Sequence, residues 1–393
     1  MRVIHVITRL IVGGAQENTI ASVLGLHRKP PLQLNLVSGP TTGPEGSLES
    51  LFAGCPWLLT IIPELVRPVH PWKDWVALRR LTRFFRENSP EIVHTHSGKA
   101  GILGRLAAHR AAVPIVIHTI HGPSFGSFQG WIANSAFRAA ERYAGRATTH
   151  FVTVADAMKQ HYLAAGIGQP DRYTKIFSGF ALDPFSAVKN DLDLRAKLGL
   201  APNDVVVGTI ARLFKLKGHE DLLAVAPTAV KSFPNLKFLL VGDGPWRSRL
   251  EERVRFLGLE RHFVFAGLVE PREVPRLIGI MDMLVHLSLR EGLPRALPQA
   301  LATSRPVIAY DCDGAREVCF ENETGFLIRP GDLSGLCERI LFLARDTGLR
   351  ERLGRNGQDF VRARFSVERM VDDLYQLYMR LAQTAGVLSP PRT

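Results

Sequence analysis

Two successive sets of apolar runs, each alternating with amphipathic segments, constrain the fold of this chain most strongly. Strand-like runs such as RVIHVIT, EIVHTH and PIVIHTI recur through the first half, and DVVVGTI, LKFLLVG and PVIAY recur through the second. Segments with helical spacing separate the runs of the first half, around residues 14–26, 73–87, 98–112, 131–145 and 155–165. Alternating strands and helices are typical of βαβ units, whose strands form parallel sheets. The sequence therefore predicts an α/β protein with two doubly wound, Rossmann-like domains in tandem.

A change of pattern between the two sets marks the expected domain joint. The segment FSGFALDPFSAVKNDLDLRAKLGLAPND interrupts the alternation with Gly, Pro and Asp, a composition typical of linkers. We predict an N-terminal domain over residues 1–185 and a C-terminal domain over residues 186–365. A last helical pattern, SVERMVDDLYQLYMRLAQ, has no strand after it and predicts a separate helix over residues 366–383.

The net charge of +12 is concentrated in the first half of the chain. Residues 1–190 contain 20 Lys and Arg against 11 Asp and Glu, whereas the remainder contains 29 against 26. An excess of positive charge indicates an anionic partner, such as a phospholipid surface, an anionic acceptor or nucleic acid. No nucleic-acid-binding motif accompanies the charge, so we expect no nucleic acid partner.

The most basic segment, RPVHPWKDWVALRRLTRFFREN, has two interpretations. Its apolar side chains recur at helical spacing: Trp72, Trp75, Leu78 and Phe85. The favoured interpretation is an amphipathic helix that packs this stripe on a sheet and leaves its arginines in solvent. The alternative is a peripheral contact with an anionic membrane.

Cysteine usage and hydropathy bear on metal content and location. The four cysteines form no C-x-x-C pair, which predicts reduced thiols and no structural metal: Cys55, Cys312, Cys319 and Cys337. Asp311 and Asp313 have the spacing of a metal chelate, but we interpret them as part of a strand-to-helix turn. No apolar run approaches the roughly 20 residues of a membrane span, and the N-terminus lacks a signal-peptide pattern. We expect a cytoplasmic protein, with the inner face of the cytoplasmic membrane as a second location.

Glycines follow the first predicted strand at the point where a helix begins. In RLIVGGAQENTI, Gly13 and Gly14 lie just ahead of that helix, where backbone N–H groups favour an anion. The string differs from the dinucleotide fingerprint G-x-G-x-x-G, and in GDGPWR an arginine, Arg247, replaces its third glycine. A phosphate site is therefore favoured over a nicotinamide site.

Charged side chains follow two predicted strands of the second half. Arg212 and Lys217 come after DVVVGTI and suit a pyrophosphate, because arginine binds two oxygens at once and lysine adds a mobile charge. Glu291 comes after MLVHLSL, where its carboxylate can accept hydrogen bonds from sugar hydroxyls. The backbone N–H groups of Gly292 and Leu293 can bind an anion beside it.

A proline and an amide follow this acid. Pro298 is tolerated only in a first helical turn, so a helix is expected to begin between Arg295 and Leu297. Gln299 then lies one turn into that helix, still near the ligand end of the sheet.

Histidines cluster at strand ends of the first half. HTHSGKAG contains His94 and His96, and HTIHGPSF contains His118 and His121. His121, in a loop beside Gly and Pro, is the preferred candidate for handling a proton or orienting a hydroxyl, and His96 is the second. His94, His118 and His150 alternate within strands, and we expect them to be packed.

The order of these motifs resembles the family 4 retaining glycosyltransferases, of the glycosyltransferase group 1 type. The resemblance covers nearly the whole chain, through GGAQ, HTHSGKAGILGRLAA, HTIHG, ARLFKLKG, VGDGP, FAGLV, EGLPRALPQALATSRPVIAYDCDGAREV and ETGFLIRPGD. It implies the GT-B fold, in which two Rossmann-like domains face each other across a cleft. It also implies that the C-terminal helix crosses back to the N-terminal domain.

The resemblance further implies the residues that bind the nucleotide-sugar donor: Gly13, Gly14, Arg212, Lys217, Val269, Glu291, Gly292, Leu293 and Gln299. Arg212 and Lys217 would neutralise the departing diphosphate. Glu291 and the backbone after it would hold the donor sugar and phosphate, and Val269 would lie by the nucleobase. His121 would border the reacting centre from the acceptor side.

The mechanism implied by the resemblance is retaining and metal-independent. An acceptor hydroxyl attacks on the face from which the diphosphate leaves, and a phosphate oxygen helps to remove its proton. The donor would be a UDP- or GDP-sugar, with no further cofactor, and the acceptor a glycan or a lipid-linked glycan. The form HTHSGKAGILGRLAA resembles bacterial enzymes of polysaccharide and lipid-linked glycan assembly.

One position departs from the family pattern. A second glutamate usually follows the residue at Glu291 by eight positions and contacts the ribose, and this chain has Gln299 there. Glutamine keeps an acceptor oxygen but loses the charge, so we expect weaker ribose binding. Two alternatives stay open: a nucleotide-sugar 2-epimerase of the same fold, which would need no acceptor, and a non-catalytic nucleotide-sugar-binding protein. Retention of Arg212, Lys217 and Glu291 favours catalysis.

Overall fold

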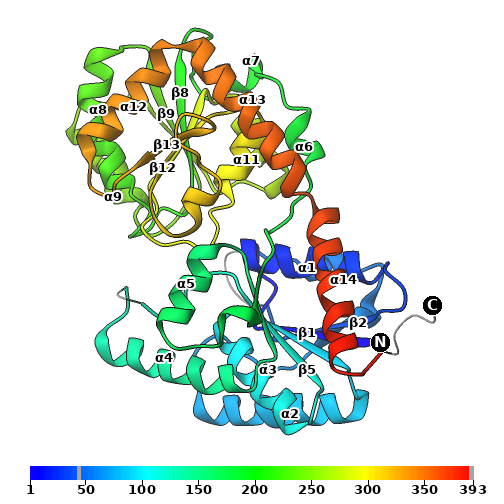
Figure 1. The fold of residues 1–393 in the computed structure, drawn as a ribbon. Coiled ribbons are helices and arrows are strands. Elements are labelled where there is room, and N and C mark those ends of the chain that lie inside the picture. The colour runs from blue at the N-terminus through cyan, green and yellow to red at the C-terminus, as the bar shows by residue number, and fades with distance from the viewer. Residues whose placement is uncertain (42–45, 127, 389–393) are drawn as a thin grey trace. The chain divides into compact units, whose positions relative to one another are not determined.

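The computed structural model describes residues 1–41, 46–126 and 128–388 (Figure 1). The chain forms two compact units. One contains Met1–Phe180 and the chain from Val367 onward, and the other contains Ala181–Ser366. The division before Ala181 lies slightly ahead of the boundary predicted at residue 186.

The first unit is built on a seven-stranded parallel sheet with the order β3-β2-β1-β4-β5-β6-β7. Its strands are β1 (Arg2–Ile7), β2 (Gln33–Ser38), β3 (Leu59–Ile61), β4 (Ile92–His96), β5 (Ile115–Ile120), β6 (His150–Thr153) and β7 (Tyr173–Lys175). Strand order reverses between β1 and β4, and ligands of doubly wound sheets bind outside the carboxyl ends at such a switch point.

Helices cover both faces of this sheet. They are α1 (Gly14–Leu26), α2 (Pro71–Asn88), α3 (Gly98–Arg110), α4 (Trp131–Arg146), α5 (Asp156–Ala164) and α14 (Val367–Thr384). Alternate residues of β1 point to opposite faces, so Val3 and Ile7 pack with α1 and α14, whereas Ile4 and Val6 pack with α2 and α3.

The C-terminal helix α14 lies along α1 within the first unit (Figure 1). Gly25 permits the close approach, because a Cβ atom there would lie 2.3 Å from Cγ2 of Val371. Met370 is buried between the helices and accepts a hydrogen bond from the Asn18 side chain. Leu374, Leu377 and other apolar side chains of α14 therefore complete the core of this unit.

Helix α2 packs a different stripe from the one predicted. Ala77, Leu81 and Phe85 are buried with Leu78 against them, whereas Trp72 and Trp75 are 65% and 44% exposed. Trp75 precedes Ala77 by two residues, which at 3.6 residues per turn places it about 200° around the helix. The prediction that both tryptophans pack on the sheet is therefore wrong.

The arginines of α2 are partly paired. Arg79 lies over the ring of Trp75 at 4.2 Å, and Arg80 contacts Glu64 at 3.1 Å. Arg83 pairs with Glu87 one turn along the helix. Most of the positive charge of this helix is therefore held at its surface by neighbouring groups.

The second unit is built on a six-stranded parallel sheet with the order β10-β9-β8-β11-β12-β13. Its strands are β8 (Val205–Ile210), β9 (Leu236–Val241), β10 (Phe263–Gly267), β11 (Met283–His286), β12 (Val307–Tyr310) and β13 (Gly325–Ile328). Its longer helices are α8 (His219–Ser232), α9 (Arg247–Phe256), α12 (Leu333–Arg345) and α13 (Thr347–Arg364). Its shorter helices are α6 (Asp183–Ser186), α7 (Leu192–Lys197), α10 (Val274–Gly279) and α11 (Ala296–Ala302).

The order reverses between β8 and β11, so the predicted charged residues follow the two central strands. Among the described residues, none of the helices combines the length and the apolarity needed to cross a membrane.

Candidate functional site

The carboxyl ends of β8 and β11 bring Lys217 and Glu291 into direct contact. Nζ of Lys217 lies 2.5 Å from Oε1 of Glu291 and 3.3 Å from Oγ of Ser288. Nε2 of His286, the last residue of β11, lies 3.3 Å from the same carboxylate oxygen. The side chains of Lys217 and Glu291 are 23% and 22% exposed, so the pair is sheltered but open to a ligand.

Two turns position this ion pair. Gly218 has φ of +70°, and a Cβ atom there would lie 2.2 Å from the carbonyl oxygen of Leu287, so the turn after β8 lies tightly against the end of β11. The backbone N–H of Glu291 donates to Oδ2 of Asp313 at 2.7 Å. The sequence did not single out His286 or Asp313 for these roles.

The carboxylates at Asp311 and Asp313 serve different partners. Asp311 accepts two hydrogen bonds from the guanidinium of Arg316, whereas Asp313 binds the Glu291 backbone. Asp313 has φ of +48° and begins a 3₁₀ turn over Asp313–Glu317, a conformation that aspartate tolerates better than most residues. This arrangement fits the predicted strand-to-helix turn better than a metal chelate.

The environment keeps Glu291 ionised. Burial alone would raise its pKa, but His286 and Lys217 together outweigh burial and lower the pKa to about 2. The folded pKa lies below the ordinary value of 4.5, so the ion pair stabilises the fold above pH 4.5 and loses this effect as the pH falls toward 2. Glu291 is therefore a charged acceptor of hydrogen bonds at neutral pH and a poor general acid.

Arg212 supplies an exposed cation at the end of β8. Its guanidinium lies 5.9 Å from the ring centroid of Phe214, and no carboxylate of the described residues pairs with it. Its carbonyl oxygen contacts Nε2 of His219, which fixes the backbone of the turn. An exposed guanidinium in the same β8–α8 connection as Lys217 is suited to bind two oxygens of an anion.

The remaining predicted donor residues of the second unit lie at different strand ends. Gly292 and Leu293 directly follow Glu291 and are buried. Helix α11 begins at Ala296, as Pro298 predicted, and the partly buried Gln299 lies in its first turn. Val269 follows β10, which β9 separates from β8, so the structure does not group it with the ion pair.

In the first unit, Gly13 and Gly14 mark the start of α1 beyond the carboxyl end of β1. Gly13 is extended, with φ of 172°, and precedes the first helical residue, Gly14. The backbone N–H of Glu17 bonds to the carbonyl of Gly13, which leaves the earlier N–H groups of α1 outside the helical ladder. This geometry is that of a helix N-terminus able to bind an anion.

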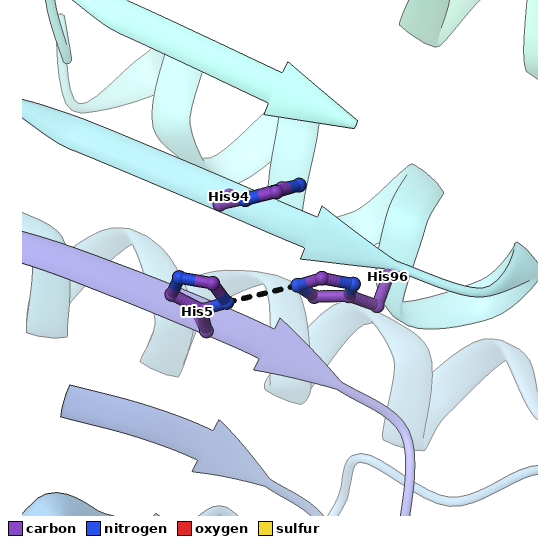
Figure 2. A group of neighbouring side chains, drawn as sticks. All are labelled: His5, His94 and His96. Carbon is purple, nitrogen blue, oxygen red and sulfur yellow. Dashed lines mark hydrogen bonds between the residues drawn. The ribbon is translucent and has the colours of Figure 1, made fainter. Parts of the chain in front are cut away.

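Four histidines meet in the interior of the first unit. His96, the second candidate for handling a proton or orienting a hydroxyl, is 1% exposed and has both ring nitrogens engaged. Its Nε2 lies 2.9 Å from Nδ1 of His5 (Figure 2), and its Nδ1 lies 3.0 Å from Nε2 of His121. His96 thus has no free nitrogen to offer an acceptor. His94, also buried, joins the cluster, whereas His121 is only partly buried and lies after β5.

The histidines that were predicted to pack within strands are confirmed as buried: His94, His118 and His150. His5 belongs to the same cluster as His94 and His96. Its position inside the apolar run RVIHVIT gave no signal of function.

The nitrogens of His5, His94 and His96 lie within 4.8 Å of one another, a grouping that could hold a metal ion. However, all six ring nitrogens of these residues already have hydrogen-bond partners. A metal bound by one nitrogen of each ring would have to displace at least two of these bonds, so we assign the rings to hydrogen bonding.

Comparisons with known proteins identify the family of the chain. Residues 190–360 match the family model described as glycosyl transferases group 1, and residues 26–176 match that of the glycosyl transferase 4-like domain. The UDP-Gal:alpha-D-GlcNAc-diphosphoundecaprenol alpha-1,3-galactosyltransferase of Escherichia coli is 27% identical over 96% of this chain and 97% of its own. The capsular polysaccharide biosynthesis glycosyltransferase CapM of Staphylococcus aureus is 25% identical over 81% of this chain and 84% of its own.

Solved structures share the architecture. HepE of Anabaena in complex with UDP matches with a TM-score of 0.81 and 21% identity, over 97% of this chain and 100% of that chain. HepE in complex with UDP-glucose matches with a TM-score of 0.79 and 22% identity, over 99% and 100%. The predicted GT-B class, with two parallel α/β sheets, is thereby confirmed. The two family models follow each other along the chain in the predicted order, and this chain belongs to the group 1 glycosyltransferases with a glycosyltransferase 4-like N-terminal region.

Proposed function

We propose that this glycosyltransferase moves a hexosyl group from a UDP-sugar to a hydroxyl of a lipid-linked or polysaccharide acceptor, with retention of anomeric configuration. The observation that carries the proposal is the Lys217–Glu291 ion pair, together with the exposed Arg212 in the same β8–α8 connection as Lys217. This group combines two cations for a diphosphate with an ionised acceptor for sugar hydroxyls.

Each residue then has a defined role in the proposed reaction. Arg212 and Lys217 stabilise the negative charge that develops on the departing diphosphate. Glu291, ionised and oriented by Lys217, accepts hydrogen bonds from the donor sugar, while the N–H groups of Gly292 and Leu293 bind phosphate. An acceptor hydroxyl attacks the anomeric carbon on the face that the diphosphate leaves, and its proton passes to a diphosphate oxygen.

The other donor contacts follow from the resemblance to the family. Gly13 and Gly14 would approach the donor phosphates, Val269 would lie by the base and Gln299 would contact the ribose. Two side-chain cations can neutralise the diphosphate without a metal ion, and on this basis we propose a metal-independent reaction with no cofactor beyond the donor.

The donor and acceptor classes rest on the relatives. HepE binds UDP and UDP-glucose, which favours uridine over guanosine. The Escherichia coli relative is named for a UDP-galactose donor and a diphosphoundecaprenol-linked acceptor, and CapM for capsular polysaccharide. We therefore place the reaction in bacterial polysaccharide or lipid-linked glycan assembly, on the cytoplasmic side of the membrane.

Nucleotide selectivity tests the proposed donor site. UDP should raise the melting temperature of the protein more than GDP or ADP at equal concentration, because a ligand that binds only the folded state stabilises it. Differential scanning fluorimetry measures the shifts. A larger shift with GDP would assign guanosine in place of uridine to the donor. No shift with UDP, GDP or ADP would refute the donor site.

A peripheral membrane contact is a further part of the proposal. Trp72 and Trp75 stack at 5.0 Å and are exposed on the basic first unit, with Trp57 and Val69 also exposed nearby in the sequence. Exposed tryptophans beside arginines are typical of surfaces that bind the interface of anionic bilayers.

Vesicle flotation tests this contact. The protein should float with phosphatidylglycerol vesicles at low salt but not with phosphatidylcholine vesicles, and a Trp72→Ser, Trp75→Ser double variant should lose most of the binding. Phe256→Ser removes a still more exposed aromatic residue, 78% exposed, from the second unit and serves as the control. Equal flotation of the double variant and the control would contradict the assignment.

A further inference from the structure

The buried histidines of the first unit form part of one continuous chain of hydrogen bonds. Oγ1 of Thr119 contacts Nε2 of His94 at 2.6 Å, and Nδ1 of His94 contacts the hydroxyl of Tyr378. The same hydroxyl contacts Nε2 of His5 at 3.0 Å.

The chain of hydrogen bonds continues toward the surface. Nδ1 of His5 contacts Nε2 of His96 at 2.9 Å (Figure 2), and Nδ1 of His96, on the other side of that ring, contacts Nε2 of His121 at 3.0 Å. It thereby links β1, β4, the end of β5 and α14, and its last member, His121, is the residue that the resemblance places at the reacting centre.

All four rings are neutral at physiological pH. Burial lowers the pKa of His5 to about 3 and that of His121 to about 4, and it lowers the pKa values of His94 and His96 well below the usual range. A neutral imidazole has one N–H donor and one acceptor nitrogen. His94, His5 and His96 must therefore each donate to one neighbour and accept from the other. Tyr378 must do the same, because its buried hydroxyl hydrogen would otherwise have no acceptor among the described residues, so all the hydrogen bonds run in the same direction.

Thr119 selects the direction. Its side chain is 3% exposed, and His94 is the partner of its hydroxyl among the described residues. If His94 donated to Thr119, the buried hydroxyl hydrogen would have no acceptor in the part of the protein that the structure describes, which costs about 1–3 kcal/mol. If Thr119 donates, every hydrogen-bonding group between Thr119 and His121 is satisfied.

We propose that Thr119, His94, Tyr378, His5 and His96 are positioning residues that hold His121 as its Nδ1–H tautomer. Nε2 of His121 then accepts a hydrogen bond from His96, and Nδ1 of His121 offers a hydrogen-bond donor to a group outside this series of hydrogen bonds. His121 would hold an oxygen of the donor or acceptor rather than remove a proton. The contact of His121 with a substrate rests on the proposed function, whereas the tautomer of His121 does not.

Nuclear magnetic resonance of the intact protein with ¹⁵N-labelled histidine tests the direction, because protonated and unprotonated ring nitrogens have well-separated shifts. We expect a proton on Nδ1 and a bare Nε2 in all four rings, assigned by single substitution of each histidine. A proton on Nε2 in all four would reverse the direction and make His121 a base. A mixture would overturn the one-directional chain.

Two matched pairs of variants test the positioning role. Thr119→Val removes the hydroxyl and should give His121 a mixture of tautomers, whereas Thr119→Ser should keep the Nδ1–H form. Tyr378→Phe interrupts the chain and should lower kcat by about tenfold with little change in KM for the donor. Tyr375→Phe on the same helix removes a hydroxyl that donates to Pro30 and should leave kcat unchanged.

These outcomes separate the two proposals. An unaltered His121 tautomer in Thr119→Val would refute the positioning role even if sugar transfer is demonstrated. An altered His121 tautomer in Thr119→Val, in a protein that has no transferase activity, would support the positioning role and refute the proposed function. The tautomer measurement on Thr119→Val and Thr119→Ser needs no activity, so it decides the question even if Tyr378→Phe does not fold.

Discussion

Lys217→Ala is expected to lower kcat/KM for sugar transfer by about 10²–10³-fold, the loss typical of removing one group that stabilises transition-state charge. In the structure, the Lys217 ammonium lies 2.5 Å from Oε1 of Glu291, so it both carries positive charge and orients the carboxylate. Its loss removes a cation from the diphosphate and lets the pKa of Glu291 rise. Steady-state kinetics with the donor varied measures the effect.

Lys215→Ala is the matched control for this variant. Lys215 lies in the same turn after β8, two residues earlier, and is exposed. The control should retain nearly full activity. A similar loss in both variants would indicate a general effect of positive charge in this turn, and near-normal activity of Lys217→Ala would remove Lys217 from the site.

Arg212→Ala is also expected to lower kcat/KM for sugar transfer by about 10²–10³-fold while leaving the fold intact. The side chain is exposed and forms no ion pair with the described residues, so its removal should change the free energy of unfolding by less than about 0.5 kcal/mol. The guanidinium is therefore available to bind the diphosphate, and its absence should weaken UDP binding as well as transfer. Calorimetric titration with UDP and thermal unfolding of the same sample separate the two effects.

Arg212→Lys refines this test. Lysine keeps the charge but cannot bind two phosphate oxygens through one planar fork. We expect it to restore only part of the lost activity. Full activity of Arg212→Ala, or a large loss of stability, would contradict the assignment of Arg212 to the diphosphate.

The sequence predicted the architecture because the buried strands of parallel sheets are apolar runs that are easily separated from helices. It missed β3, β7 and β13, of which β3 and β7 have only three residues, too few to give a periodic signal. The stripe on α2 was misassigned because Trp72 and Trp75 are apolar but lie outside the face set by Ala77 and Phe85.

The site was only partly predictable for a related reason. Strand ends identified Arg212, Lys217 and Glu291, since charged residues there stand out from the apolar runs. The contacts that orient Glu291 come from His286 and Asp313, and a single sequence does not specify which strand-end groups meet across a sheet.

The histidine cluster shows the same limit. His96 was a candidate for handling a proton or orienting a hydroxyl because it ends a strand. The structure instead buries it between His5 and His121, and this arrangement depends on pairing between β1 and β4.

The central claim is tested most directly by proton nuclear magnetic resonance of the reaction itself. The protein is incubated with UDP-galactose or UDP-glucose, with and without short-chain lipid diphosphates that bear GlcNAc or other single hexoses. The proposed function predicts a new α-anomeric signal from a disaccharide, together with free UDP, only when an acceptor is present. A β-linked product would contradict retention, and a 2-epimer of the donor formed without acceptor would contradict sugar transfer.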